Sequence, residues 1–313
     1  MGFELKFQKT PEGSMERVKL GSTDVEVSRL GMGTGTAHPS GHCAQALMST
    51  KELAGLLLYA FDRGINFWDT AVQYRTHPHV REALRGVRRT DVVISTKLTT
   101  SGPKDTLREF NSALRELGID YVDVCLLHAV RTERELRARS GALDTLLRLK
   151  DEGKVRAVGM SSHGLGALKA VTTTPGIDAV WVRINLAGIN MDAAKLGIYD
   201  RVAAVPWVKK TAALLPKRLQ AALRPSPEAL LVSEDDCREV EETAAKIHAL
   251  SKGVVGMKVI AEGQLRTEAK RAVEYVRDLS FVDSLVIGML NRREIEENCR
   301  IVTAGGGTPC VTE

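Results

Sequence analysis

The 313-residue sequence is poor in aromatic residues, which make up only 4% of it. A core for a chain of this length must therefore be built mainly from Val, Leu, Ile and Ala, which are typical of parallel strands buried on both faces. Cysteine is also scarce, with five residues far apart and none in a CxxC pair. This spacing argues against a zinc site and a disulfide framework, and reduced thiols in the cytoplasm are the simplest explanation.

Long apolar runs and strong charge are absent as well. No stretch approaches the roughly 20 apolar residues needed to span a bilayer, and the N-terminus lacks the basic-then-apolar layout of a signal peptide. The net charge is only +5, and Lys and Arg are dispersed along the chain. We therefore expect no membrane span and no nucleic-acid partner, although the positive charge could help to attract a phosphorylated cofactor.

Short runs rich in Val and Ile alternate with longer amphipathic stretches from Ser28 onward. This alternation predicts βαβ units around a parallel sheet, and hence an α/β fold, an eight-stranded parallel (β/α) TIM barrel. The eight expected strands are residues 29–33, 65–69, 92–96, 122–127, 155–160, 179–184, 254–260 and 284–288. Expected helices include 50–63 with Ser49 or Thr50 as cap, 104–117 closed by Gly118, and 141–152 closed by Gly153.

Four segments complete the expected organisation. Residues 18–27 predict a small β-hairpin that plugs the lower end of the barrel, and the barrel domain as a whole spans 15–303. Residues 1–14 are interpreted as a leader or tag-like segment, and 304–313 as a flexible tail. Residues 186–236, after the sixth strand, are far longer than an ordinary connection and predict a lid-like insertion. A basic amphipathic helix at 201–224 would cover the active site or the surface rather than bind a membrane.

Polar residues recur where the expected strands end, and a barrel gathers such ends at one rim. They are Asp69, Lys97, His128, Ser161 and Asn185, and Tyr74 is close enough to Asp69 in sequence to fold over the same rim. Each has an ordinary structural alternative, such as a turn cap for Asp69 or a satisfied core histidine for His128. Their joint occurrence at successive strand ends favours a chemical role.

Reduction of a carbonyl by hydride transfer needs a proton donor at the carbonyl oxygen, and Tyr74 can supply it. Free tyrosine has a pKa of about 10, which a nearby cation lowers by stabilising the phenolate. Lys97 is the available cation, and Asp69 would hold its ammonium. His128 would donate a hydrogen bond to the carbonyl oxygen or pass a proton to Tyr74.

Three motifs carry a resemblance to a known family: residues 64–71 followed by Tyr74, Ser95-Thr96-Lys97, and Leu126-Leu127-His128. They resemble the catalytic tetrad of the aldo-keto reductases, over roughly residues 18–303. The resemblance implies a β/α barrel that uses NAD(P)H without a metal to reduce an aldehyde or ketone. It assigns Tyr74 as general acid, Lys97 and Asp69 as its tuning pair, and His128 as the substrate-orienting donor.

The resemblance also implies a set of cofactor residues. Gly33 and Thr34 lie in the first-strand turn, and residues 256–263, with Lys258 and Gly263, are similar to the loop that clasps the pyrophosphate. A buried strand with a polar turn is an equal alternative for that loop. Glu297 and Asn298 would hold the adenine edge.

Some cofactor positions depart from the family pattern. Ser161 and Asn185 match the residues that hold the nicotinamide carboxamide, but Ser162 replaces the usual Asn and Arg183 the usual Gln. Glu294 and Gly288 stand where an Arg and a Lys usually bind the 2′-phosphate of NADP. A carboxylate repels phosphate but accepts from a ribose hydroxyl. Because Arg292 and Arg293 lie nearby, NADP is the expected cofactor and NAD the alternative.

The last two points are a possible metal site and the function of the whole chain. His77 and His79 lack a third ligand nearby in sequence, so no metal site is expected. The leading hypothesis is a cytoplasmic carbonyl reductase, a monomer or weak homo-oligomer acting on a small carbonyl compound that the sequence does not identify. The alternative is a regulatory or channel-associated subunit that binds the cofactor with little turnover.

Overall fold

The eight Val- and Ile-rich runs form strands that are almost entirely buried, and they close into a parallel barrel in the order β10-β3-β4-β5-β6-β7-β8-β9. The computed structural model describes residues 15–38, 42–192 and 231–304. The strands are β3 Leu30–Gly33, β4 Phe67–Asp69, β5 Val93–Leu98, β6 Val122–Val130, β7 Val155–Ser162, β8 Ala179–Arg183, β9 Gly253–Met257 and β10 Ser284–Gly288. The predicted fold class is confirmed, with strand ends displaced by a few residues.

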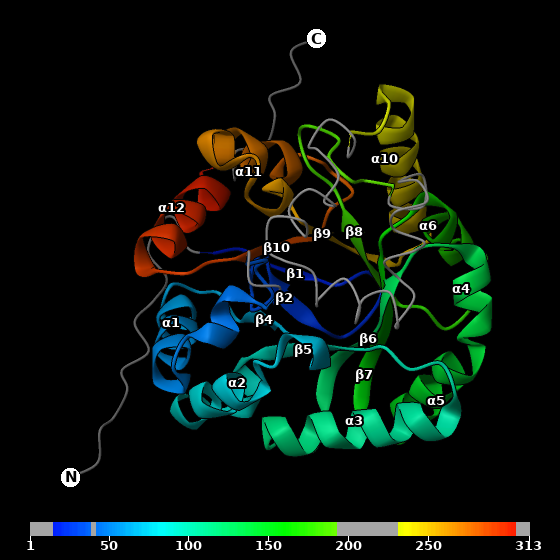
Figure 1. The fold of residues 1–313 in the computed structure, drawn as a ribbon, viewed down its shortest axis with the longest axis horizontal. Coiled ribbons are helices and arrows are strands. Elements are labelled where there is room, and N and C mark those ends of the chain that lie inside the picture. Colours follow the sequence, from blue (N-terminus) through cyan, green and yellow to red (C-terminus); the bar gives the residue numbers. More distant parts are fainter. Residues whose placement is uncertain (1–14, 39–41, 193–230, 305–313) are drawn as a thin grey trace, which may run out of the picture.

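Helices surround the barrel on its outside (Figure 1). They are α1 Thr50–Asp62, α2 His77–Ala83, α3 Pro103–Leu117, α4 Glu133–Ala138, α5 Ser140–Asp151, α6 Leu165–Val171, α10 Glu234–Ala249, α11 Ala269–Arg277 and α12 Arg292–Thr303. Short 3-10 turns are η1 Ala44–Leu47, η2 Val72–Tyr74, η3 Leu84–Gly86, η4 Arg89–Asp91, η6 Ala261–Gly263 and η7 Arg266–Glu268. None of the helices in the described ranges is long and apolar enough to cross a bilayer.

Local sequence signals explain several helix ends. Ser49 caps α1 and forms a reciprocal capping box with Glu52, and Gly118 ends α3 in the left-handed region at φ 68°. Ser233 caps α10, which begins at Glu234, so the last three residues of the expected insertion at 186–236 are helical. The amphipathic helix expected at 201–224 lies outside the described residues.

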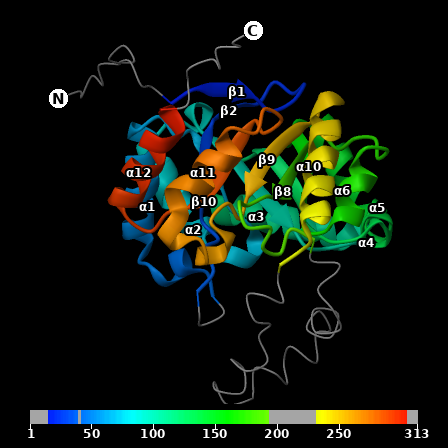
Figure 2. The ribbon, with the colours of Figure 1, turned by 90° about the horizontal axis from the view of Figure 1, so that it is seen from above.

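The predicted hairpin plug is confirmed. Strands β1 Arg17–Lys19 and β2 Glu26–Ser28 pair antiparallel and lie across one end of the barrel (Figure 2). Their buried residues Leu20, Val25 and Val27 join the cluster inside the barrel. Gly21 has a φ of 57°, and a Cβ there would lie 2.4 Å from the backbone nitrogen of Gly253. Only glycine therefore fits where the hairpin meets the start of β9.

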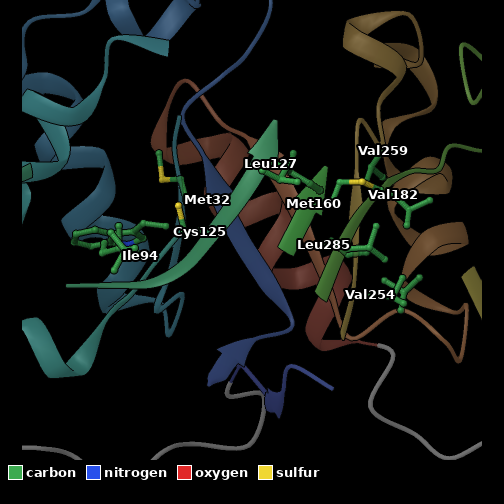
Figure 3. Close-up of a cluster of buried hydrophobic side chains, with 14 of the residues drawn as sticks. Met32, Ile94, Cys125, Leu127, Met160, Val182, Val254, Val259 and Leu285 are labelled. Atoms are coloured by element: carbon green, nitrogen blue, oxygen red, sulfur yellow. The ribbon is translucent and has the colours of Figure 1, made fainter. Parts of the chain in front are cut away.

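Alternating side chains divide the core into two layers. Outward-facing residues such as Met32, Ile94, Cys125, Leu127 and Met160 pack between the strands and the helices (Figure 3). Their inward-facing neighbours, including Phe67, Val93, Val124 and Leu126, fill the barrel interior. The next inward positions along β4, β5 and β6 are polar, and they open the functional site at the carboxyl ends of the strands.

Candidate active site

Strand periodicity explains why three of the predicted residues converge. Asp69 lies two residues after inward-facing Phe67, Lys97 lies at even spacing after Val93, and His128 lies two residues after Leu126. Each side chain therefore continues the inward row of its own strand to the rim. The structure brings all three together with Tyr74, which η2 carries over the same rim.

Lys97 and Asp69 form a buried ion pair. The Lys97 Nζ lies 2.5 Å from Asp69 Oδ2, and the two residues are only 1% and 4% exposed. The other carboxylate oxygen of Asp69 accepts from the Ser95 hydroxyl at 2.5 Å and from the Trp181 indole at 3.0 Å. Burial lowers the pKa of Lys97, and the charge of Asp69 opposes that shift. The extra donors help to offset the desolvation of the pair.

Tyr74 lies against Lys97 and His128. The Lys97 Nζ is 4.9 Å from the centroid of the Tyr74 ring, and the His128 ring meets it edge-on at 5.6 Å between centroids. Burial, followed by the charge of Asp69, raises the pKa of Tyr74. This differs from the expectation that Lys97 lowers the pKa, because desolvation of the phenolate and the charge of Asp69 outweigh the positive charge of Arg183. The phenol is thus protonated at neutral pH, as a proton donor must be.

His128 is buried and neutral. Burial, followed by the positive charges of Lys97 and Arg139, lowers the pKa of His128 to about 3. Its Nδ1 is buried without a hydrogen-bond partner among the described residues. A neutral imidazole still has one N–H to donate, so His128 can orient a carbonyl oxygen but cannot act as an imidazolium at neutral pH.

Gly35 and Trp181, which the sequence analysis does not assign to the site, contact Tyr74 and Asp69 respectively. A Cβ at Gly35 would lie 2.4 Å from the Tyr74 ring, so only glycine leaves room for that ring. Trp181 reaches Asp69 across the barrel.

Thr34, expected near the cofactor, is instead fully buried, and its hydroxyl bonds Thr76 at 2.8 Å. Thr34 therefore ties β3 to the loop that carries Tyr74.

A cavity of about 1080 Å³ opens from these residues and runs to α12. Its size is that of a large ligand pocket, about 300 to 1,000 Å³ being usual for small molecules. The predicted residues that line it are Gly33, Asp69, Tyr74, Lys97, Lys258, Gly263, Gly288, Glu294, Glu297 and Asn298. The predicted residues outside its lining are Thr34, His128, Ser161, Ser162, Asn185 and Arg292.

The residues expected to hold a carboxamide are engaged within the fold. The Asn185 side chain bonds both backbone groups of Ile189, at 2.8 and 2.9 Å. Ser162 donates to the Gly164 carbonyl at 2.9 Å, and the Ser161 hydroxyl accepts from the Ala129 amide at 2.7 Å. These contacts shape the rim of the barrel and limit what the three side chains can offer to a ligand.

A charged cluster stands beside the cavity. Glu262 contacts Arg183 at 3.3 Å and Lys258 at 3.1 Å, and Arg183 also lies 3.5 Å from His163 Nδ1. Lys258, Ala261 and Glu262 all have left-handed backbone conformations, with φ of 59°, 44° and 57°. Such conformations cost energy in non-glycine residues and concentrate at ligand clamps and active sites. Lys258 also explains why β9 ends at Met257 and not at 260.

At the α12 end of the cavity, the partners of the charged side chains differ from those expected from the sequence. The Glu294 carboxylate accepts from the Leu290 amide at 2.8 Å and the Asn291 side chain at 2.9 Å, which closes the start of α12. Arg292 stacks on the Tyr59 ring at 4.7 Å, and Arg293 pairs with Glu297 at 2.7 Å. The cations that line the cavity, besides Lys97, are Lys258, Arg266, Lys270 and Arg300.

The two histidines after Tyr74 are structural in their contacts. His77 lies between the Glu116 carboxylate at 2.8 Å and the Thr96 hydroxyl at 3.0 Å, and His79 contacts the Met48 carbonyl at 3.2 Å. Within the described part of the chain, no three His, Cys, Asp or Glu side chains gather as a group that could hold a metal ion.

Comparison with known proteins links this geometry to one family. The model of the Aldo/keto reductase family matches residues 29–304. The NADH-specific methylglyoxal reductase of Escherichia coli is 28% identical over 60% of this chain and 60% of its own length. An Arabidopsis thaliana protein with the name "Probable voltage-gated potassium channel subunit beta" is 24% identical over 92% of this chain and 91% of its own.

The fold has solved counterparts. A Pseudomonas aeruginosa structure assigned to the aldo-keto reductases superposes with a TM-score of 0.66 at 24% identity, and covers 92% of this chain and 95% of that one. This likeness shows the fold. The chain spans 60% and 53% of the lengths of the first two curated relatives that it matches.

Proposed function

Because the chain belongs to the aldo/keto reductase family, we propose that it is an NAD(P)H-dependent oxidoreductase that reduces an aldehyde or ketone to an alcohol. The observation that carries this proposal is the convergence of Asp69, Tyr74 and Lys97 at one end of a cavity large enough for a dinucleotide, with the His128 ring against Tyr74. A nicotinamide cofactor bound there would supply the hydride. The protein would supply the proton and the orientation.

Tyr74 is the proposed general acid. A phenol is protonated at neutral pH, so the proton is available when negative charge develops on the carbonyl oxygen. Burial raises the pKa of Tyr74 and makes it a weaker acid, so the reaction depends on stabilisation of the phenolate. The phenolate left behind is stabilised by the Lys97 ammonium near the ring, which Asp69 fixes at 2.5 Å. Neutral His128 orients the carbonyl oxygen by hydrogen bonding.

The remainder of the cavity suits a dinucleotide. Gly33, Gly263 and Gly288 leave its wall free of side chains, and Lys258, Arg266 and Lys270 bring positive charge that favours a pyrophosphate. Glu297 and Asn298 on α12 are proposed to contact the adenine edge. The strained loop from Lys258 to Gly263 would clasp the phosphates.

We propose NADH as the preferred cofactor, although NADP is the cofactor expected from the sequence. The expectation of NADP depended on Arg292 and Arg293, but neither lines the cavity, and they contact Tyr59 and Glu297 respectively. Gly288 supplies no positive charge where the resemblance to the family implies a lysine, and a Cβ there would lie 1.9 Å from the Thr36 hydroxyl. Glu294 places a negative charge at this end.

The cofactor assignment is tested by tryptophan fluorescence, since Trp181 lines the cavity. Titration with NADH and NADPH should show tighter binding of NADH. Glu294→Gln removes the charge and keeps one of the two acceptors at the start of α12, so it should improve NADPH binding at a small cost in melting temperature. Tighter NADPH binding by the unaltered protein would show that Arg266, Lys270 or Arg300 reads the 2′-phosphate.

Catalysis is tested with Tyr74→Phe, which removes only the hydroxyl. We expect carbonyl reduction to fall by roughly 100-fold or more, as when a general acid is lost, while the dissociation constant of the cofactor stays within about twofold. Activity that survives in this variant would exclude Tyr74 as the acid.

A second candidate function is a cofactor-binding subunit with little turnover, which the relative named as a potassium channel subunit suggests. The buried Lys97–Asp69 pair beside Tyr74 favours catalysis, because a binding module has no need of a proton donor. Cofactor binding without reduction of any aldehyde in a broad panel would favour the subunit.

A further inference from the structure

Arg139 is a buried arginine, 8% exposed, whose role the proposed chemistry does not explain. It lies between α4 and α5, and its guanidinium donates to three backbone carbonyls: His128 at 2.8 Å, Leu98 at 2.7 Å and Thr100 at 3.1 Å. No carboxylate of the described residues forms a salt bridge with it. A buried cation without a paired anion is costly, and burial lowers the pKa of Arg139.

The three acceptors lie where β5 and β6 stop pairing. The last residue pair matched between these strands is Leu98 with Leu127. Beyond that pair, the Arg139 side chain links the two strands through its hydrogen bonds to the Leu98 and His128 carbonyls. The same two strands carry Lys97 and His128 at their carboxyl ends. One side chain therefore fixes the separation of two residues of the proposed active site.

The backbone around His128 is irregular. Between the pairs Leu127–Met160 and Val130–Ser162, β6 has one residue more than β7. Ala129 takes a φ of 56°, and its amide donates to the Ser161 hydroxyl at 2.7 Å. Bulges of this kind redirect side chains next to active sites. Arg139 and Ser161 hold this bulge from opposite sides.

The loop after β5 is held from its other side as well. The Thr99 and Thr100 amides donate to the Glu109 carboxylate at 2.9 and 3.3 Å. Arg139 binds the Thr100 carbonyl and Glu109 binds its amide, so both polar backbone groups have a fixed partner. The end of β5 is thereby fixed in position on both sides.

We propose that Arg139 is a positioning residue for Lys97 and His128, because its guanidinium ties together the strand ends that carry them. The effect of Arg139 on turnover rests on the proposed carbonyl reduction. The effect of Arg139 on the position of the His128 ring is independent of that proposed function.

A matched control exists at the opposite end of the same strands. Arg89 also donates to backbone carbonyls, those of Val92 at 2.9 Å and Tyr121 at 3.1 Å, just before β5 and β6 begin. It additionally pairs with Asp123 at 2.7 Å. Contacts at this end of a barrel serve stability, and those at the carboxyl end serve the site.

The experiment compares Arg139→Lys, Arg139→Met and Arg89→Met with the unaltered protein. Arg139→Lys keeps the positive charge but places its donors on one nitrogen, whereas the three carbonyls are bound by three different guanidinium nitrogens, so it isolates the positional role. The His128 ring proton signal is followed by NMR in cofactor-free protein and assigned with His128→Gln. The kcat and KM are measured with 4-nitrobenzaldehyde, and cofactor affinity by tryptophan fluorescence.

Both Arg139 variants should shift the His128 signal and lower kcat by about 10- to 100-fold, with cofactor affinity within about twofold. Arg89→Met should lower the melting temperature without changing the signal or kcat. An unchanged His128 signal in Arg139→Lys would overturn the proposal. If the unaltered protein reduces no aldehyde, the proposed function fails, and the NMR comparison still decides the role of Arg139. If Arg139→Met does not fold, Arg139→Lys alone decides.

Discussion

Asp69→Asn should be among the most destabilising substitutions in this chain. The Asn side chain can keep accepting from Ser95 and Trp181, but its amide nitrogen would turn a donor toward the Lys97 ammonium. Lys97 would then be a buried charge with the Thr70 carbonyl, at 2.8 Å, as its remaining partner. Breaking a buried ion pair in this way costs about 3–5 kcal/mol. For a chain of 313 residues that is a decrease of roughly 5 to 8 °C in melting temperature.

The loss of stability caused by Asp69→Asn should depend on pH, and its direction follows from the pKa of Lys97. Burial lowers the pKa of Lys97 in the folded protein, and removal of Asp69 lowers it further. Between the folded pKa and the unfolded value of about 10.4, the unfolded chain binds more protons, so stability rises with pH. The destabilisation by Asp69→Asn should therefore be largest near pH 7 and smaller at pH 9.5, where the variant can bury a neutral lysine.

Urea denaturation at the two pH values measures this effect. Asp105→Asn is the control, because it makes the same substitution in an exposed pair with Arg108 on α3 and should cost less than about 1 kcal/mol. Asp69→Asn combined with Lys97→Met should recover much of the lost stability, since both charges are then gone. Equal losses for Asp69→Asn and Asp105→Asn would refute the reasoning that the Lys97 charge is desolvated.

Three further substitutions test other parts of the structure. Gly35→Ala should lower kcat at least about tenfold by displacing the Tyr74 ring, whereas Gly55→Ala, where a Cβ meets nothing within 4 Å, should leave kcat unchanged in steady-state assays. Gly21→Ala should destabilise the hairpin plug by more than about 1 kcal/mol in thermal unfolding, because its φ is 57° and its Cβ would strike the backbone at 2.4 Å. Ser49→Ala should cost about 1 kcal/mol through loss of the α1 cap, and a melting temperature equal to that of the unaltered protein would contradict the cap.

The residues that could be predicted from sequence are those fixed by periodicity. The period of two along β4, β5 and β6 places Asp69, Lys97 and His128 at the rim once a barrel is assumed. Local signals also sufficed for Ser49 and Gly118, because a cap depends on neighbouring residues. These are short-range rules that a single sequence displays directly.

Long-range contacts could not be predicted in this way. Trp181 reaches Asp69 although 112 positions separate them, and no local pattern marks the pair. The direction of the Tyr74 pKa was wrong because burial, which sequence does not give, outweighs the nearby cation. Arg292 and Arg293 looked available for a phosphate until the structure showed Tyr59 and Glu297 as their partners.

The two ends of β5 and β6 show how the same side chain serves stability or chemistry according to its counterion. At the amino end Arg89 is paired with Asp123, which also binds Arg156 at 2.7 Å. At the carboxyl end, among the described residues, Arg139 has carbonyls as acceptors and no carboxylate in salt-bridge range. Its charge is left to act on His128, where it helps to lower the pKa and keep the imidazole neutral. Glu109 and Glu135 lie near enough to raise the pKa of Arg139 against the effect of burial, although neither forms a salt bridge with it. The positive charge of Arg139 is therefore partly offset, and burial remains the first cause of the neutral imidazole of His128.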